Sequence, residues 1–292
     1  MVVAMQIDRN AADGLGQPLA ATPRASTLTR PGATVRYWVS GPDDAPLVVF
    51  SHGAAIDHRT WEPQAGFVQR YRVVTYDIRG HGASLATKAF DFSDAVDDLL
   101  ALLDALGATS AVLIGQSMGG NVAQEVAYRQ PRRVTALVLV GCACNTWRLT
   151  RFERWLGKVA ISLAALYSPS ALNRSTAKRS SVSPSVREYI EHTASAMPPR
   201  QQRAVLRSLF CALHPDPSYR TPIPELLIRG EYDRLGNAKK VMPRWARRDP
   251  HASYVVIGDA GHVANQDNPT QFNDVLSAFL GTVAPCPPRR GH

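Results

Sequence analysis

One serine of this chain has the surroundings of a nucleophile. Ser117 lies in the stretch LIGQSMGG, residues 113–120, directly after a run of apolar, strand-forming residues. A Gly-x-Ser-x-Gly turn between a buried strand and a helix holds its serine in a cramped backbone conformation and exposes the hydroxyl oxygen. Gly115 and Gly119 relieve crowding in such a turn and let the helix approach the strand. The expected chemistry is attack of the serine on a carbonyl carbon.

A serine nucleophile needs a general base, because its hydroxyl is barely ionised at neutral pH. Of the eight histidines, His262 stands in VVIGDAGHVANQ, on a loop after an apolar run. That is the edge at which α/β sheets hold their ligands. The carboxylate that orients the imidazole is expected to be Asp233, past the end of the run LLIRG, and Glu231 and Asp259 remain alternatives.

An acyl-transfer site also needs hydrogen-bond donors for the developing oxyanion. The backbone N–H of Met118 is the first candidate, because this residue follows the serine at the start of a predicted helix. The second candidate is the backbone N–H of Ala54, in the segment SHGAA after another apolar run. We expect His52, in the same segment, to be structural.

The composition limits the class of protein. The chain has 292 residues, 45% of them hydrophobic, which is enough for one large α/β domain or for a domain with an inserted subdomain. No apolar run approaches the roughly 18 residues of a membrane span. Asp8, Arg9 and Asp13 interrupt the N-terminal segment where an export signal needs a continuous apolar stretch. We therefore expect a cytoplasmic protein without stable membrane insertion.

The cysteines and the charge exclude further classes. Cys142 and Cys144 alternate on a predicted strand end, and the Cys-x-x-Cys spacing of zinc sites does not occur, so we expect reduced thiols, no metal and no cofactor. The net charge is +9, and residues 147–220 hold twelve basic and four acidic residues. No nucleic-acid-binding motif accompanies them, so we expect no nucleic-acid partner. The basic segment either faces an anionic substrate or is a solvated surface.

Strand patterns alternate with helix patterns along most of the chain. The expected strands are residues 34–39, 47–50, 72–76, 111–115, 135–140, 223–230 and 253–258, and the expected helices are residues 91–107, 118–128, 238–245 and 271–280. This alternation predicts a mostly parallel sheet with helices on both faces. Residues 147–215 lack strand patterns and are broken by prolines, which indicates a helical insertion.

Five segments, in this order, resemble the α/β-hydrolase family: SHGAAIDHRTW, YDIRGHGAS, GQSMGG, RGEYDRL and GDAGHVANQDNP. The resemblance runs from about residue 30 to residue 281. It implies an eight-stranded sheet, a triad of Ser117, Asp233 and His262, and a helical cap inserted after the sixth strand. It also implies that Asp77 and Arg79 brace the loops beside the site. The expected domains are a flexible extension (1–26), a core (27–146 and 216–281), a cap (147–215) and a flexible tail (282–292).

Within this family the motifs are most similar to the carboxylesterase and 3-oxoadipate enol-lactonase branch. A serine at position 117 argues against haloalkane dehalogenases and epoxide hydrolases, whose nucleophile is an aspartate. The resemblance implies a serine hydrolase that cleaves a small-molecule ester or lactone through an acyl-enzyme. The alternatives are a carbon–carbon bond hydrolase, a perhydrolase or a weakly catalytic small-molecule receptor. The oligomeric state stays open, and the substrate-binding candidates are Ala55, Trp147, Trp155 and Val263.

Overall fold

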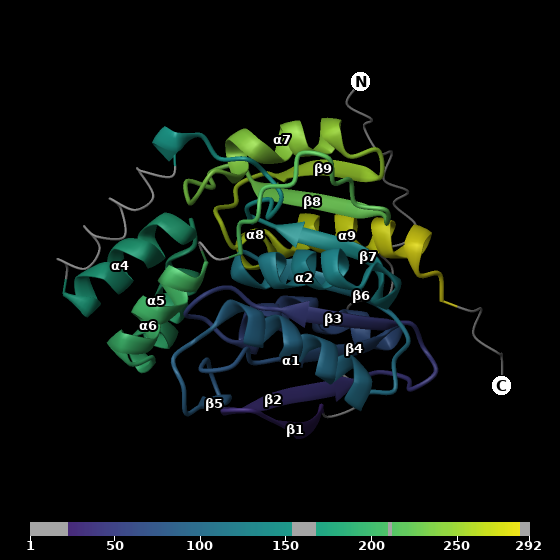
Figure 1. Cartoon of the computed structure of the whole chain (residues 1–292), viewed down its shortest axis with the longest axis horizontal. Coiled ribbons are helices and arrows are strands. Elements are labelled where there is room, and N and C mark those ends of the chain that lie inside the picture. The colour runs from purple at the N-terminus through teal and green to yellow at the C-terminus, as the bar shows by residue number, and fades with distance from the viewer. Residues whose placement is uncertain (1–22, 154–167, 210–211, 287–292) are drawn as a thin grey trace.

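The computed structural model describes residues 23–153, 168–209 and 212–286, and a sheet forms its centre (Figure 1). The strands are β1 (Arg24–Arg30), β2 (Ala33–Ser40), β3 (Leu47–Ser51), β4 (Arg72–Tyr76), β5 (Leu85–Ala86), β6 (Ala111–Gln116), β7 (Val134–Val140), β8 (Glu225–Gly230) and β9 (Ala252–Ile257). Their order is β1-β2-β4-β3-β6-β7-β8-β9, and the two-residue β5 pairs with β2 beside this path. The main path therefore has the eight strands that the family resemblance implies, one more than the seven strand patterns found in the sequence.

The sheet is mostly parallel. Strand β2 is antiparallel to β1 and to β4, whereas every pair from β4 to β9 along the path is parallel. Central strands such as β3 (LVVFS) and β6 (AVLIGQ) are buried at every position. Continuous apolar runs of this kind are typical of parallel strands that are covered on both faces.

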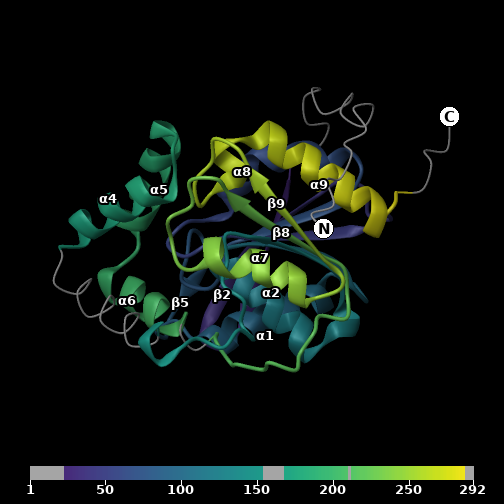
Figure 2. The ribbon, with the colours of Figure 1, turned by 90° about the horizontal axis from the view of Figure 1, so that it is seen from above.

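Helices cover both faces of the sheet (Figure 2). On one face lie α1 (Phe92–Ala105), α2 (Met118–Arg129) and α7 (Ala238–Arg248), which contribute Leu99, Val122 and Trp245 to one core cluster. On the other face lie the 3-10 segment η2 (His58–Gln69), α8 (Ala264–Asp267) and α9 (Pro269–Val283). Their Trp61 and Phe272 belong to a second core cluster. A short 3-10 turn, η3 (Pro131–Arg133), precedes β7.

The helical insertion is present and follows β7, the sixth strand of the main path. In its described part it contains α4 (Pro169–Ser180), α5 (Pro184–Ala196) and α6 (Pro199–Ser208), which lie together at one side of the sheet in both ribbon views. Each of these helices has a proline in its first turn. Proline suits this position, because the missing N–H would have no partner within the helix. The prolines that interrupt the sequence pattern are therefore helix starts.

Besides the short elements β5, η3 and α8, two longer elements are absent from the sequence-based assignment. Strand β1 has the sequence RASTLTR and pairs with β2 at seven positions, although it lacks an apolar run. Segment η2 contains Pro63, which weakens its helical pattern. No helix among the described residues is both long enough and apolar enough to cross a membrane.

Candidate active site

Ser117 occupies the turn between β6 and α2. Its backbone has φ 51° and ψ −115°, which places a non-glycine residue at positive φ. Such a conformation is strained and persists where the surrounding structure holds it. Here the N–H of Ser117 donates to the carbonyl of Val140 at 2.8 Å, and its own carbonyl accepts from the N–H of Asn121 at 3.1 Å.

Close backbone packing explains the glycines around this serine. A Cβ atom on Gly115 would collide with the backbone of Gly119, the second residue of α2. A Cβ atom on Gly119 would collide with the carbonyl oxygen of Ser51 and would lie 2.6 Å from that of His52. Glycine at both positions therefore lets β3, β6 and α2 meet at the serine.

The imidazole of His262 and the carboxylate of Asp233 form a buried pair. His262 follows β9 and Asp233 follows β8, and Nδ1 of the histidine lies 3.1 Å from each carboxylate oxygen of the aspartate. This contact makes Nδ1 the donating nitrogen and leaves Nε2 as the nitrogen that accepts a proton. In the described chain no hydrogen bond joins Nε2 to Ser117. Catalytic hydrogen bonds of this kind are often long before substrate binds.

Two hydrogen bonds hold the backbone of His262 beside the serine turn, and a glycine leaves room for its imidazole. Nε2 of Gln116 donates to the carbonyl of His262 at 3.2 Å. The N–H of His262 donates to the carbonyl of Ser180, at the end of α4, at 2.7 Å. Gly141 has φ 60°, and a Cβ atom there would lie 3.0 Å from Nδ1 of His262 and 3.2 Å from the Asp233 carboxylate. Gln116 and Ser180 could not be recognised from the sequence, because both bind His262, which lies far away from them in the chain.

The two alternative carboxylates, those of Glu231 and Asp259, do not contact the imidazole of His262. Glu231 and Asp259 are exposed, and the Glu231 carboxylate accepts a hydrogen bond from the N–H of Asp259 at 3.3 Å. Asp233, by contrast, is 4% exposed. The carboxylate that contacts the imidazole is therefore the one that lies further beyond its strand.

The candidate oxyanion donors border Ser117 on two sides. Met118 is the first residue of α2, where backbone N–H groups have no partner within the helix. Ala54 follows Gly53, and a Cβ atom on Gly53 would lie 3.4 Å from Cβ of Ser117. The loop with Ala54 therefore passes directly beside the serine.

His52 has a structural environment. Its Nδ1 donates to the carbonyl of Gly53 at 2.7 Å, and its Nε2 accepts from the N–H of Ile78 at 2.9 Å. Burial lowers the pKa of this histidine, which keeps the ring neutral. Both ring nitrogens are thus used to join the loop after β3 to the loop after β4.

The residues of the DIRGHG stretch also brace loops. Asp77 accepts hydrogen bonds from the backbone N–H groups of His58, at 2.8 Å, and Ala83, at 2.7 Å. Arg79 is buried and pairs with Asp94, at 2.5 Å, and with Asp98, at 2.6 Å, both on α1. These contacts fix the loops on one side of the serine turn.

A cavity of about 790 Å³ lies between the cap and the loops after β3 and β4. Ala55, one of the predicted substrate-binding residues, lines it together with Arg59, Lys88 and Arg200. Its volume is in the range of small-molecule sites. Ser117 and His262 do not line it among the described residues, so the cavity begins one loop away from them.

The other predicted substrate-binding residues have different surroundings. Val263 is buried and packs with Ile56 against Ala177 and Ile190 of the cap. Trp147 packs against α7, where the guanidinium of Arg248 lies 5.5 Å from its ring centroid. Trp155 lies outside the described residues.

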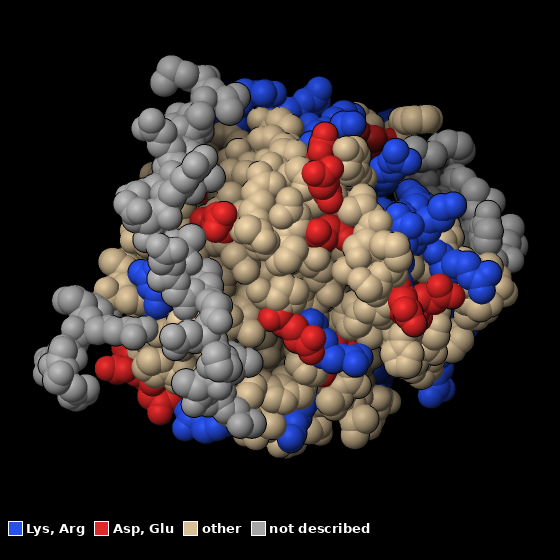
Figure 3. Space-filling view, turned by 180° about the vertical axis from the view of Figure 1, so that it is seen from behind, with Lys and Arg blue, Asp and Glu red and all other residues tan. Residues whose placement is uncertain are grey.

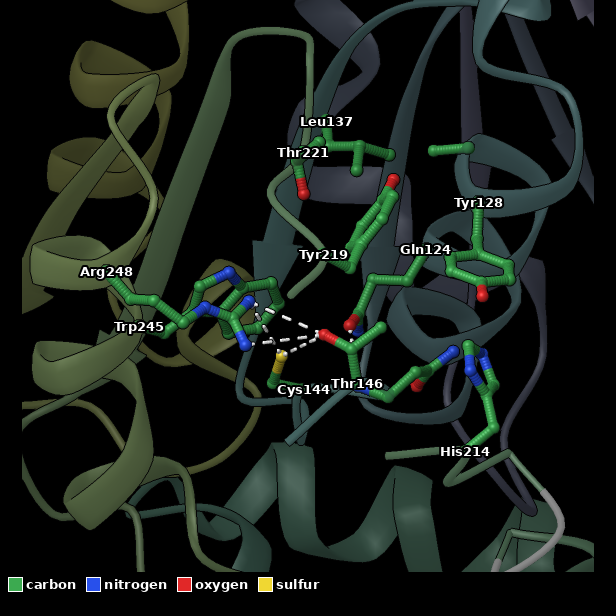
Figure 4. Close-up of a pocket in the computed structure, with 12 residues that line it drawn as sticks. Gln124, Tyr128, Leu137, Cys144, Thr146, His214, Tyr219, Thr221, Trp245 and Arg248 are labelled. Atoms are coloured by element: carbon green, nitrogen blue, oxygen red, sulfur yellow. Dashed lines mark hydrogen bonds between the residues drawn. The ribbon is translucent and has the colours of Figure 1, made fainter. Parts of the chain in front are cut away.

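A second, much smaller cavity lies between α2, β7 and α7 (Figure 4). Cys144, Thr146 and Arg248 point into it and are joined by hydrogen bonds. Its volume of about 10 Å³ suits a single water molecule. The described residues contain no group of three or more His, Cys, Asp or Glu side chains that could hold a metal ion.

Basic side chains gather over the cap and along α7 (Figure 3). The described residues of α4, α5 and α6 include Arg174, Lys178, Arg179, Arg187, Arg200, Arg203 and Arg207, against Glu188 and Glu191. Helix α7 adds Lys239, Lys240, Arg244, Arg247 and Arg248. The excess of positive charge is therefore on the side of the molecule that carries the cavity and on the adjoining helix.

The fold and this constellation define a class of protein. The chain belongs to the alpha/beta hydrolase family, whose sequence model matches residues 48–275. Among similar curated proteins is 3-oxoadipate enol-lactonase 1 of Acinetobacter baylyi, 27% identical over 256 residues that cover 87% of this chain and 96% of that protein. A putative non-heme bromoperoxidase of Mycobacterium tuberculosis is 28% identical over 246 residues, or 81% of this chain and 94% of the relative.

Solved structures give the same class. An enol-lactonase from Burkholderia xenovorans superposes with a TM-score of 0.76 at 26% identity, covering 87% of this chain and 99% of that one. An esterase from Thermogutta terrifontis superposes with a TM-score of 0.75 at 24% identity, covering 90% of this chain and all of that one. The similarity to the esterase supports the assignment of the fold alone.

Proposed function

We propose that this protein is a serine hydrolase that cleaves a small-molecule carboxylic ester or lactone through an acyl-enzyme intermediate. The observation that carries the proposal is the buried pair of His262 and Asp233, with Nδ1 at 3.1 Å from both carboxylate oxygens, beside the strained turn of Ser117. The two similar proteins named as enol-lactonases favour a lactone, which is a cyclic ester, as substrate.

In the proposed reaction the hydroxyl oxygen of Ser117 attacks the substrate carbonyl while Nε2 of His262 takes the hydroxyl proton. Asp233 holds the donating Nδ1–H and stabilises the imidazolium that forms. The backbone N–H groups of Met118 and Ala54 donate to the tetrahedral oxyanion. His262 then protonates the leaving oxygen, and a water molecule hydrolyses the acyl-enzyme by the same route. In a lactone the leaving hydroxyl stays attached to the acyl group.

We also propose that the substrate is anionic and extends into the 790 Å³ cavity. Of the charged residues that line this cavity, Asp57 pairs with Arg59 at 2.7 Å, and Asp77 accepts hydrogen bonds from the backbone N–H groups of His58 and Ala83. Lys88 and Arg200 have no ion-pair partner among the described residues. The lining thus has three cations, Arg59, Lys88 and Arg200, against two carboxylates, and this net positive charge favours a carboxylate-bearing substrate.

The proposed function is tested with a fluorophosphonate probe and with p-nitrophenyl esters of increasing acyl length. The wild type should be labelled and should show turnover with a preferred chain length, whereas Ser117→Ala should show neither. Binding of esters without turnover by the wild type would favour the receptor alternative. Hydrolysis that persists in Ser117→Ala would contradict the assigned nucleophile.

A further inference from the structure

The segment between α4 and α5 lies directly on the loop that carries His262. We call this loop, residues 258–263 between β9 and α8, the histidine loop. We call residues 180–183 the cap linker. The carbonyl of Ser180 accepts two hydrogen bonds from this loop, from the N–H of His262 at 2.7 Å and from the N–H of Val263 at 3.2 Å. A Cβ atom on Gly261 would lie 2.7 Å from the same carbonyl oxygen and 3.1 Å from Cα of Ser181. The two backbones thus approach so closely that they leave no room for a side chain.

The carboxylate of Asp267 also joins the cap linker to the histidine loop. Asp267 of α8 accepts hydrogen bonds from the hydroxyl of Ser181, from the N–H of Val182 at 3.2 Å and from the N–H of Ser183 at 3.3 Å. It also accepts from the N–H of Gly261 at 2.7 Å, on the histidine loop itself. Ser183 is the N-cap of α5, so the negative charge also lies where the helix dipole favours it.

We propose that Asp267 is a positioning residue for His262. This inference rests on the proposed function, in which His262 is the general base. Asp267 holds the cap linker against Gly261, and the linker in turn supplies the carbonyl that binds the N–H of His262. The imidazole therefore has its productive position when the cap linker is seated, and a displaced linker moves the base away from Ser117.

The hydrogen bonds of the Asp267 carboxylate are best tested by the substitution Asp267→Asn. In Asp267→Asn one acceptor oxygen is replaced by an NH₂ group that faces backbone N–H groups, while the size of the side chain is kept. The negative charge is lost as well. Because a base misplaced by about 1 Å costs up to roughly 100-fold in rate, we expect kcat to fall by about tenfold or more. KM should change by less than about threefold, since the cavity is not altered.

A second tether of the cap provides the matched control. The hydroxyl of Tyr189 on α5 donates to Asp57 on the loop after β3, at 3.0 Å from Oδ1, and accepts from the Asp57 N–H at 3.3 Å. Tyr189→Phe removes this attachment of the cap without touching the histidine loop. We expect it to change kcat by less than about twofold, because the general base keeps its position.

The experiment compares kcat, KM and the rate of fluorophosphonate labelling of Ser117 in the wild type, Asp267→Asn, Asp267→Glu and Tyr189→Phe, each well below its Tm. Asp267→Asn should lower kcat and the labelling rate together, and Asp267→Glu should recover part of both. If Asp267→Asn does not fold, Ser181→Ala removes one donor of the same cluster and should lower both rates by roughly threefold.

Two results would overturn the inference. One is an Asp267→Asn variant, or its Ser181→Ala substitute, with unchanged kcat and labelling rate. The other is an equal loss in Tyr189→Phe, which would assign the effect to cap attachment in general. A failure of the proposed function is distinguishable, because it would appear as undiminished labelling and turnover in Ser117→Ala.

Discussion

Gln116 donates from Nε2 to the backbone carbonyl of His262 at 3.2 Å, across 146 positions of the chain. The residue before the candidate nucleophile therefore binds the candidate base. Strands β7 and β8 lie between β6 and β9 in the sheet, so this side-chain contact crosses the ends of two strands. This hydrogen bond fixes the position of the histidine loop relative to the serine turn.

Replacing this glutamine should slow the reaction without weakening substrate binding. Gln116→Met keeps a side chain of similar size but removes the N–H donor. We expect kcat to fall by roughly three- to tenfold with little change in KM, because the base loses part of its support. Gln130→Met, at the exposed far end of α2, serves as the control. Steady-state kinetics on a p-nitrophenyl ester measure both, and equal kcat values for the two variants would refute the role of this contact.

Gly119→Ala should disrupt the serine turn. The added Cβ would meet the carbonyl oxygens of Ser51 and His52, which belong to backbone that has little freedom to move. We expect a loss of about 1–3 kcal/mol in the free energy of unfolding and of most activity. In Gly281→Ala the Cβ has no atom within 4 Å, and alanine in the helix should be neutral or stabilising by about 0.5–1 kcal/mol. Similar urea midpoints for the two variants would contradict the close packing described at Gly119.

The buried carboxyl of Glu225 should make stability fall with rising pH. Neither of its oxygens has a hydrogen-bond partner among the described residues, and burial raises its pKa to about 8, against an ordinary 4.5. The neutral form is kept on folding, so this group's contribution to stability is complete below about pH 4.5 and is lost as the pH approaches 8.

Glu225→Gln should remove this pH dependence, because the amide is neutral at every pH. The Tm of the variant relative to the wild type should rise from pH 5.5 to pH 8.5, by roughly 2–4 °C for each kcal/mol of ionisation cost removed. Glu188→Gln, an exposed site, controls for the lost charge. A Tm difference that stays constant over this range would show that folding does not perturb Glu225.

The cations of the cavity should select for charge on the substrate. Lys88→Gln and Arg200→Gln should raise KM for a carboxylate-bearing ester by roughly two- to fivefold each, and leave a neutral ester of the same size unaffected. Added salt should reduce the preference of the wild type, because exposed charges are screened. Lys239→Gln on α7 is the matched control. Equal effects on both esters, insensitive to salt, would end the proposal of an anionic substrate.

The sequence predicted the fold because its central strands carry continuous apolar runs. The runs around Val49, Ile114 and Val138 lie in buried parallel strands, as expected. Strand β1 escaped prediction, because an edge strand of alternating small and polar residues is set by pairing with β2 rather than by its own pattern. Segment η2 was not predicted for a similar reason. Its helical structure is stabilised by the packing of Trp61 and Phe67 on the sheet, although Pro63 disfavours a helix in the sequence pattern.

The residues of the candidate site could be predicted where the neighbouring sequence has a recognisable pattern. Ser117 stands in a distinctive turn, and His262 and Asp233 follow strand ends, so all three could be proposed from the sequence. Asp267 and Ser180 could not, because their importance arises from contacts between the cap linker and the histidine loop. No local pattern records a contact of that kind.

The most direct test of the account is the site of covalent labelling by a fluorophosphonate, located by mass spectrometry of the digested protein. We expect one modified residue, Ser117, no label in Ser117→Ala, and labelling slowed by at least about 100-fold in His262→Ala. A label on another residue, or a His262→Ala variant that reacts as fast as the wild type, would contradict the pairing of this serine with this base.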